Sequence, residues 1–191
     1  MIHESNGSPA TAGGVKLRTG RFLPLAIDVT AKRCLVIGGG RIGTRKTLTL
    51  LGAGADVTVI SPEASGDVER LAVSGRVRWL RRRYQPGDPD GFFLAVAATA
   101  DPQRNQAIGR DARRAGVLAC VVSSSADSDT IFPATHAVGP LTIAVHSDGR
   151  RCRRSKEASG EIARWLSREA SPRNGEAAEI PSFRQPGKLS E

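Results

Sequence analysis

Aromatic side chains and cysteines are both scarce in this chain of 191 residues. Aromatic residues make up 4% of the sequence, which argues against a protein that binds nucleic acid by stacking bases on aromatic rings. The three cysteines, Cys34, Cys120 and Cys152, lie far apart and form no CxxC pair, so they predict neither a disulfide framework nor a zinc site. His136 and His146 also lack a recognised ligand spacing, and we expect no metal site.

Long apolar runs are absent as well. No stretch of 18 apolar residues and no signal-like N-terminal segment occurs, which predicts a soluble cytoplasmic protein with no membrane partner. Residues 1–20 are rich in Gly, Ser, Thr and Ala and predict a disordered leader. Residues 169–191, rich in Pro, Asn, Gly, Glu and Ser, predict a disordered tail.

Acidic residues are outnumbered, and the formal net charge is +9. Much of the excess lies in two arginine runs, at residues 81–83 and 150–154. Such runs are typical of a solvated face, but they also suit a nucleic acid, an anionic membrane surface or a small polyanionic substrate. Nucleic acid is the least favoured of these partners, since the chain has no recognisable helix-turn-helix or aromatic RNA-binding motif.

The most informative motif is a glycine-rich turn after a short apolar run. Strand-forming residues 35–37 lead into three glycines, and helix formers resume after Gly40. Gly38, Gly40 and Gly43 match the G-x-G-x-x-G fingerprint, whose glycines allow a tight turn, close approach of a pyrophosphate, and close helix–strand packing. A glycine turn can be purely structural, but a second strand at 56–60 supplies the expected context. The turn therefore predicts a dinucleotide site at Gly38, Gly40, Arg41, Ile42 and Gly43.

Strand-like and helix-like segments alternate through the first two thirds of the chain. This alternation predicts an α/β protein with a Rossmann-type, doubly wound parallel sheet over residues 21–122. Residues 123–168 predict a small β-rich segment followed by a C-terminal helix. The predicted strands are 35–37, 56–60, 77–80, 92–98, 117–122, 130–134 and 141–145, and the last helix spans about 152–168.

The end of the second strand is where an adenosine ribose would lie, and it has no obvious acidic residue. Ser61 and Pro62 occupy the position. The Ser61 hydroxyl could bond the ribose or cap the following helix. Arg41 or Arg45 could instead accept the 2′-phosphate of NADP, so the choice between NAD and NADP stays open at this point.

Thr99 and Asp101 follow the fourth strand, where the nicotinamide half of a cofactor would pass. They are candidate cofactor contacts. Asp101, which precedes Pro102, also fits a helix N-cap.

Several segments together, in this order and spacing, resemble the precorrin-2 dehydrogenase module of sirohaem synthases over about residues 20–168. The resemblance implies an oxidoreductase that converts precorrin-2 to sirohydrochlorin with NAD, in some members followed by ferrochelatase activity. It also implies a homodimer whose central β segments interlock. The matching segments are residues 38–46, 55–63, 97–101 with Asn105, 131–134 and 139–145.

Two departures from the family pattern bear on catalysis. The family's proposed general base, an aspartate after the fifth strand, is replaced by Ser123, which is not basic at neutral pH. Asp127 and Asp129 could stand in for it or could be turn residues. A non-catalytic NAD- or tetrapyrrole-binding carrier is therefore the alternative function.

The second departure is a basic run in place of the family's small Gly- and Ser-rich turn. Because arginine pairs carboxylates bidentately, this run is a candidate site for the tetrapyrrole's carboxylates. The candidate substrate-binding residues are Arg150, Arg151, Arg153 and Arg154.

Overall fold

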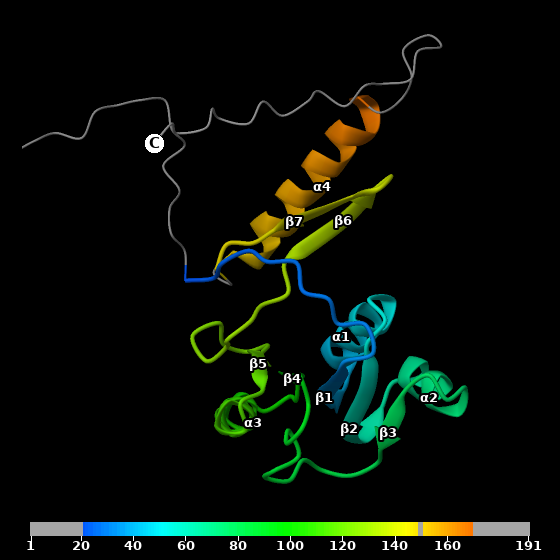
Figure 1. The fold of residues 1–191 in the computed structure, drawn as a ribbon, viewed down its shortest axis with the longest axis vertical. Helices are drawn as coiled ribbons and strands as arrows, with labels where there is room; N and C mark the ends of the chain where they lie inside the picture. The colour runs from blue at the N-terminus through cyan, green and yellow to red at the C-terminus, as the bar shows by residue number, and fades with distance from the viewer. Residues whose placement is uncertain (1–20, 149–150, 170–191) are drawn as a thin grey trace, which may run out of the picture.

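The computed structural model describes residues 21–148 and 151–169, and its larger part is a parallel five-stranded sheet in the order β3-β2-β1-β4-β5 (Figure 1). This order confirms the predicted Rossmann-type architecture. The strands are β1 (Arg33–Gly39), β2 (Asp56–Ala64), β3 (Arg78–Leu80), β4 (Leu94–Ala97) and β5 (Leu118–Val121), and the helices between them are α1 (Arg41–Gly52), α2 (Gly66–Val73) and α3 (Pro102–Arg114).

The core lies on both faces of the sheet, as the apolar runs of the central strands predict. Successive residues of β1 point to opposite sides. Val36 packs on the face covered by α1 and α2, whereas Leu35 and Ile37 pack on the face covered by α3. The chain changes face between β1 and β4, which are neighbours in the sheet. In this topology a ligand binds outside the carboxyl ends of the strands at that change of direction.

The strand β2 is longer than the sequence predicts. It continues through Ser61 to Ala64, where Ala64 pairs with Gly39 after an irregularity in the register. The pairing with β3 ends at Ile60, so Pro62, which has no N–H, costs no hydrogen bond to β3. The expectation of a helix that begins at Ser61 is therefore wrong, and α2 begins only at Gly66.

The second structural unit is an antiparallel hairpin with one helix. Its strands are β6 (Ala134–Val138) and β7 (Leu141–Val145), and α4 (Cys152–Glu169) packs against them. The expected strand at 130–134 is wrong, because Asp129 and Thr130 donate their backbone N–H groups to the Ala119 carbonyl of β5 instead. The strand starts where this pairing has ended. The alternating apolar positions of residues 22–29 are compatible with an edge strand or with an arm beside β1, and the structure shows no strand over these residues.

Small side chains hold α4 on the hairpin. Ser155, Ser159 and Ala163 follow one another at intervals of four residues and are buried. The Nδ1 atom of His136 on β6 lies 2.8 Å from the Ser159 hydroxyl oxygen. The opposite face of α4 carries Trp165, which is 60% exposed.

Parts of the predicted organisation lie outside the described residues. These are the predicted leader at 1–20, Arg150 in the basic run, and residues 170–191 of the predicted tail, whose first member, Glu169, belongs to α4. Within the described part of the chain, no helix is both long and apolar enough to span a membrane.

Candidate functional site

Two glycines of the fingerprint are required by the fold itself. Gly38 has φ +116°, and a Cβ there would lie 2.3 Å from the Ala98 carbonyl oxygen. A Cβ on Gly43 would lie 1.8 Å from the Gly38 carbonyl oxygen. Strand β1, strand β4 and helix α1 can therefore approach one another only because these two positions lack side chains.

Gly40 is different, because nothing inside the chain requires it. Its φ of −75° and ψ of −177° suit any residue, and a Cβ there would meet no atom within 4 Å. Gly40 is the N-cap of α1, where no side chain caps the helix and no acidic residue lies in the first turn. The first amides of the helix thus have no side-chain cap, and the space at Gly40 is open beside a favourable dipole, an arrangement that suits a phosphate.

A pair of hydroxyl groups fixes this turn, and the sequence analysis missed it. The hydroxyls of Thr44 and Ser65 lie 2.8 Å apart, and Thr44 also donates to the Gly40 carbonyl oxygen at 3.0 Å. Ser65 caps α2 by accepting the Val68 N–H. The acidic residues of the next turn, Asp67 and Glu69, are the signal that could have marked this start.

The predicted ribose contacts lie beside the glycine turn. Ser61 is a buried residue of β2 whose carbonyl oxygen accepts the indole N–H of Trp79 at 3.0 Å. It is therefore not a helix cap, and that alternative for its role is wrong. Pro62 is exposed, as are Arg41 and Ile42 in the first turn of α1.

The ends of β4 and β5 meet at a buried asparagine. Asn105 of α3 accepts the Thr99 N–H at 2.9 Å and the Thr99 hydroxyl at 2.7 Å. Its amide nitrogen donates to the Thr99 carbonyl oxygen at 3.1 Å and to the Ser123 hydroxyl at 3.5 Å. Asp101 caps α3 by accepting the N–H groups of Gln103 and Arg104, which confirms its expected capping role. The structure thus brings Thr99 and Ser123 together through Asn105.

The two candidate stand-ins for the missing aspartate bond along the outer edge of β5. Asp129 accepts the Ala119 N–H at 3.2 Å and lies 3.6 Å from the guanidinium of Arg113. The same arginine donates to the carbonyl oxygen of Asp127 at 2.6 Å. The Asp129 carboxylate is thus engaged with β5 and α3, and Asp127 is held through its backbone carbonyl.

The start of α4 lies near α1. The ammonium of Lys46 lies 3.9 Å from the centre of the Phe132 ring, a cation–π contact. Burial lowers the pKa of Lys46, and the nearby Cys120, Arg45 and Cys152 add smaller effects. Cys152 is the first residue of α4, so this helix begins within electrostatic reach of the glycine-turn helix. The exposed residues Arg151, Arg153 and Arg154, called the α4 arginines below, lie just before α4 and in its first turn.

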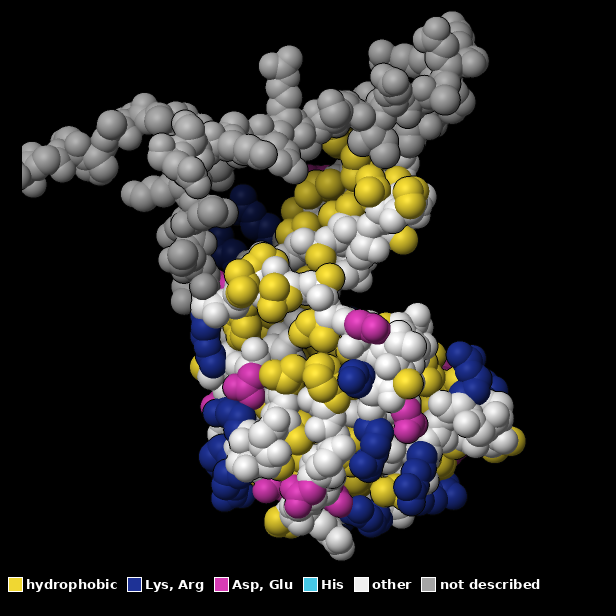
Figure 2. Space-filling model, viewed as in Figure 1, with side chains coloured by type: hydrophobic (Ala, Val, Ile, Leu, Met, Phe, Trp, Pro, Cys, Tyr) yellow, Lys and Arg dark blue, Asp and Glu magenta, His cyan; other side chains and the backbone are white. Residues whose placement is uncertain are grey.

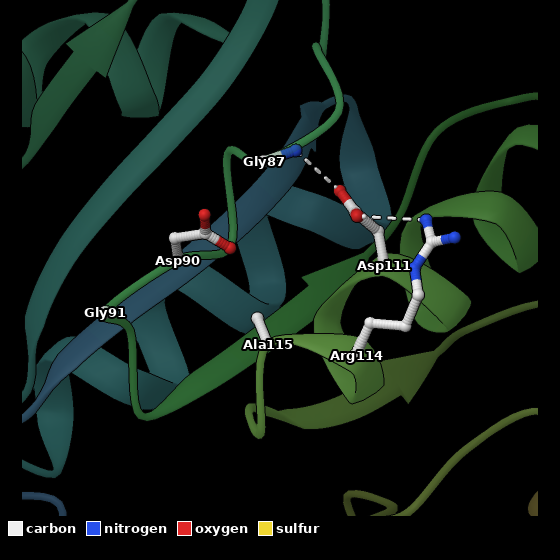
Figure 3. A pocket seen from close by; sticks show the side chains of 6 residues that line it. All are labelled: Gly87, Asp90, Gly91, Asp111, Arg114 and Ala115. Carbon is white, nitrogen blue, oxygen red and sulfur yellow. Dashed lines mark hydrogen bonds and ion pairs between the residues drawn. The ribbon is translucent and has the colours of Figure 1, made fainter.

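A separate hollow of about 400 Å³ lies away from the glycine turn, at the other end of the strands (Figure 3). Its lining residues precede β4 and β5, whereas the glycine turn lies at the carboxyl ends of the strands. Asp111 there accepts the Gly87 N–H at 2.8 Å, and its other oxygen lies 3.2 Å from Arg114. Asp111 is thus already paired within the lining, and none of the predicted site residues lines the hollow. The lining residues are Gly87, Asp90, Gly91, Asp111, Arg114 and Ala115.

Comparisons with known proteins agree with this geometry. A family model described as "Putative NAD(P)-binding" matches residues 25–134. The siroheme synthase of Chromobacterium violaceum is 41% identical over 128 residues, 67% of this chain and 27% of the relative. The siroheme synthase of Azotobacter vinelandii is 37% identical over 145 residues, 76% of this chain and 31% of the relative. The chain therefore spans less than a third of the length of these relatives.

Among solved structures, one described as "SirC, precorrin-2 dehydrogenase" aligns with a TM-score of 0.67 at 25% identity. The alignment covers 78% of this chain and 75% of that one, so it includes more than the nucleotide-binding unit. These similarities confirm the resemblance that the motifs predicted.

Proposed function

Because the chain belongs to this NAD(P)-binding family, we propose that it is a dehydrogenase that oxidises precorrin-2 to sirohydrochlorin with NAD. Similarity to siroheme synthases and to a precorrin-2 dehydrogenase supports the substrate. The observation that carries the proposal is the open space at Gly40, in front of an uncapped helix N-terminus. Cytoplasmic location follows as part of the proposal, since the reaction draws on the NAD pool.

The residues of the glycine turn would hold the cofactor. The backbone amides of Arg41 and Ile42 would bind the diphosphate, and Ser61 and Pro62 would lie along the adenosine ribose. Thr99 would lie beside the nicotinamide half. When bound, NAD supplies the acceptor for the hydride that leaves the tetrapyrrole. We propose NAD rather than NADP on the family resemblance, and the exposed Arg41 and Arg45 make the comparison of the two cofactors a direct test.

Oxidation of the tetrapyrrole releases a proton together with the hydride. Ser123, at the end of β5, is exposed and carries a hydroxyl that cannot take that proton at neutral pH. The proton would pass to water instead. General-base help is typically worth about 10²–10⁴-fold in rate, so we expect slow turnover rather than none.

The substrate would lie between the glycine turn and the start of α4. Precorrin-2 carries several carboxylates, and the α4 arginines present guanidinium groups that can pair them bidentately. Arg153 already has a partner in Glu157 at 2.9 Å, on the exposed surface of α4. Positioning of the substrate by such contacts is where the chain itself would contribute most to the rate.

We also propose a homodimer. A two-stranded hairpin is marginal on its own, and the hairpin with α4 exposes Trp165, Ile162 and Leu141. Figure 2 shows hydrophobic side chains gathered over this unit. A second copy would cover them, in line with the family's interlocking β segments.

The decisive experiment is an anaerobic assay of NADH formation from precorrin-2 by the purified chain. We expect slow but enzyme-dependent reduction of NAD to NADH, faster than the reduction of NADP to NADPH. Ser123 favours one other function, a non-catalytic carrier. Tight binding of both NAD and the tetrapyrrole, with no NADH formed by the parent or by Ser123→Asp, would establish the carrier and exclude the dehydrogenase.

A further inference from the structure

The orientation of the Asn105 amide is determined by its neighbours. This side chain is 1% exposed and lies between the loops that follow β4 and β5. The Thr99 backbone N–H can face only the amide oxygen, since a flipped amide would set two donors against each other. The amide nitrogen must then face the Thr99 carbonyl oxygen and Ser123.

This orientation decides what the Ser123 hydroxyl can do. Its oxygen accepts a hydrogen from Asn105, the hydrogen-bond partner of this hydroxyl among the residues that the structure describes. The hydroxyl's own hydrogen therefore points elsewhere, and Ser123 is exposed at the carboxyl end of β5. An exposed donor at this edge of the sheet is available to an acceptor atom on a bound molecule.

The sheet order indicates which part of a dinucleotide lies there. The diphosphate belongs at the turn after β1, and the adenosine half lies toward β2. Because β4 and β5 follow on the other side of β1, the nicotinamide half extends over their ends. The acceptor that this half presents beside its ring is the carboxamide oxygen.

We propose that Asn105 is a positioning residue that fixes the Ser123 hydroxyl as a hydrogen-bond donor to the nicotinamide carboxamide oxygen. The inference rests on the NAD binding of the proposed function but not on its reaction. It gives the serine that replaces the family's aspartate a role in orienting the cofactor. Asn105 acts through Ser123 and touches no reacting atom.

The test compares NAD with ADP-ribose, which lacks only the nicotinamide, by calorimetry on the full chain. Ser123→Ala should weaken NAD binding by about 2- to 10-fold, the worth of one hydrogen bond, and leave ADP-ribose binding unchanged. Ser123→Thr, which keeps the hydroxyl, should retain the parent's affinity for NAD. Equal NAD affinity in the parent and Ser123→Ala would overturn the proposal, as would an equal loss for ADP-ribose.

Asn105→Asp tests the positioning itself. At neutral pH the new carboxylate accepts from the Ser123 hydroxyl and turns its hydrogen away, so NAD binding should weaken as it does in Ser123→Ala. Lowering the pH should restore the affinity of Asn105→Asp for NAD, because the protonated carboxyl donates to Ser123 again. The double variant, Asn105→Asp with Ser123→Ala, should bind NAD no more weakly than Ser123→Ala alone. A purely structural role predicts the same loss in both backgrounds at every pH, which would refute the assignment.

Two further outcomes separate this inference from the proposed function. If Asn105→Asp does not fold, as thermal melting would show, Ser123→Ala and Ser123→Thr still decide whether this hydroxyl donates to the cofactor, and unchanged NAD affinity in Ser123→Ala still overturns the proposal. If the expected NAD pattern is found but precorrin-2 is not oxidised, the inference stands and the proposed reaction fails.

Discussion

Substitution of Gly40 separates what the fold needs from what the cofactor needs. In Gly40→Asp, the new side chain meets open space and a backbone conformation that every residue adopts. Aspartate is also a favoured N-cap, so we expect stability equal to that of the parent or higher by a few tenths of a kcal/mol. Thermal melting should therefore show no loss.

Cofactor binding should respond in the opposite direction. One charge pair about 4 Å apart contributes about 1 kcal/mol in bulk water and about 4 kcal/mol at an effective dielectric constant of 20. Repulsion of this size between the carboxylate and one diphosphate charge lowers affinity by about 5- to 1,000-fold. The aspartate would also occupy amides that the diphosphate needs. Calorimetric titration with NAD measures the loss, which should shrink at high salt.

The matched control is Gly38→Ala, two residues earlier in the same turn. It places a Cβ 2.3 Å from the Ala98 carbonyl oxygen at a φ of +116°, so it should destabilise the fold itself. Gly40→Asp with parental stability and unchanged NAD affinity would refute the diphosphate assignment. A comparable loss of stability in both variants would refute the distinction drawn between the two glycines.

The remaining predictions concern the other parts of the molecule. Ser123→Asp should raise the rate of NADH formation, by at most about 10²–10⁴-fold. A rate below that of the parent would refute the role of a carboxylate at this position as a general base. Replacing the α4 arginines by glutamine should weaken tetrapyrrole binding and leave NAD binding unchanged. Each lost contact should cost about 1.5–3 kcal/mol of binding free energy if it is desolvated and much less if it is exposed. Fluorescence titration with the tetrapyrrole would measure the loss. Trp165→Glu should shift the protein toward monomer in sedimentation, and an unchanged dimer would place the interface elsewhere. Burial raises the pKa of Cys34 and of Cys120 from 9.0 to about 11. Because the unfolded chain then ionises these thiols first, their contribution to stability is complete below pH 9 and is lost between pH 9 and 11. A melting temperature that stays constant over this pH range would contradict the prediction.

The sheet could be predicted because its signals are local. Apolar runs such as 35–37 and 56–60 are strands buried on both faces, and such runs stand out in the sequence. The glycine spacing likewise predicts the turn, since Gly43 is required by a contact with the Gly38 carbonyl oxygen, five residues earlier.

The misplaced boundaries depend on contacts between distant residues. Ser61 precedes a proline and an acid, as helix caps do, but the pairing of Gly39 with Ala64 prolongs the strand past it. The start of β6 shifted for the same kind of reason, because residues before it pair with β5. In the site, Thr99 and Ser123 were expected separately. Asn105, which connects them, lies 18 positions before Ser123, and this contact follows only from the packing of α3.

The fold-back of residues 128–130 along β5 has a consequence for colloidal behaviour. An open strand at the end of a sheet offers unpaired N–H and C=O groups to other chains and invites aggregation. Here the Ser128 hydroxyl accepts the Val121 N–H at 2.9 Å, and the Asp129 carboxylate accepts that of Ala119. Two polar side chains thus take the place of a sixth strand. They leave this end of the sheet without the backbone donors from which an edge-to-edge ribbon of molecules could grow.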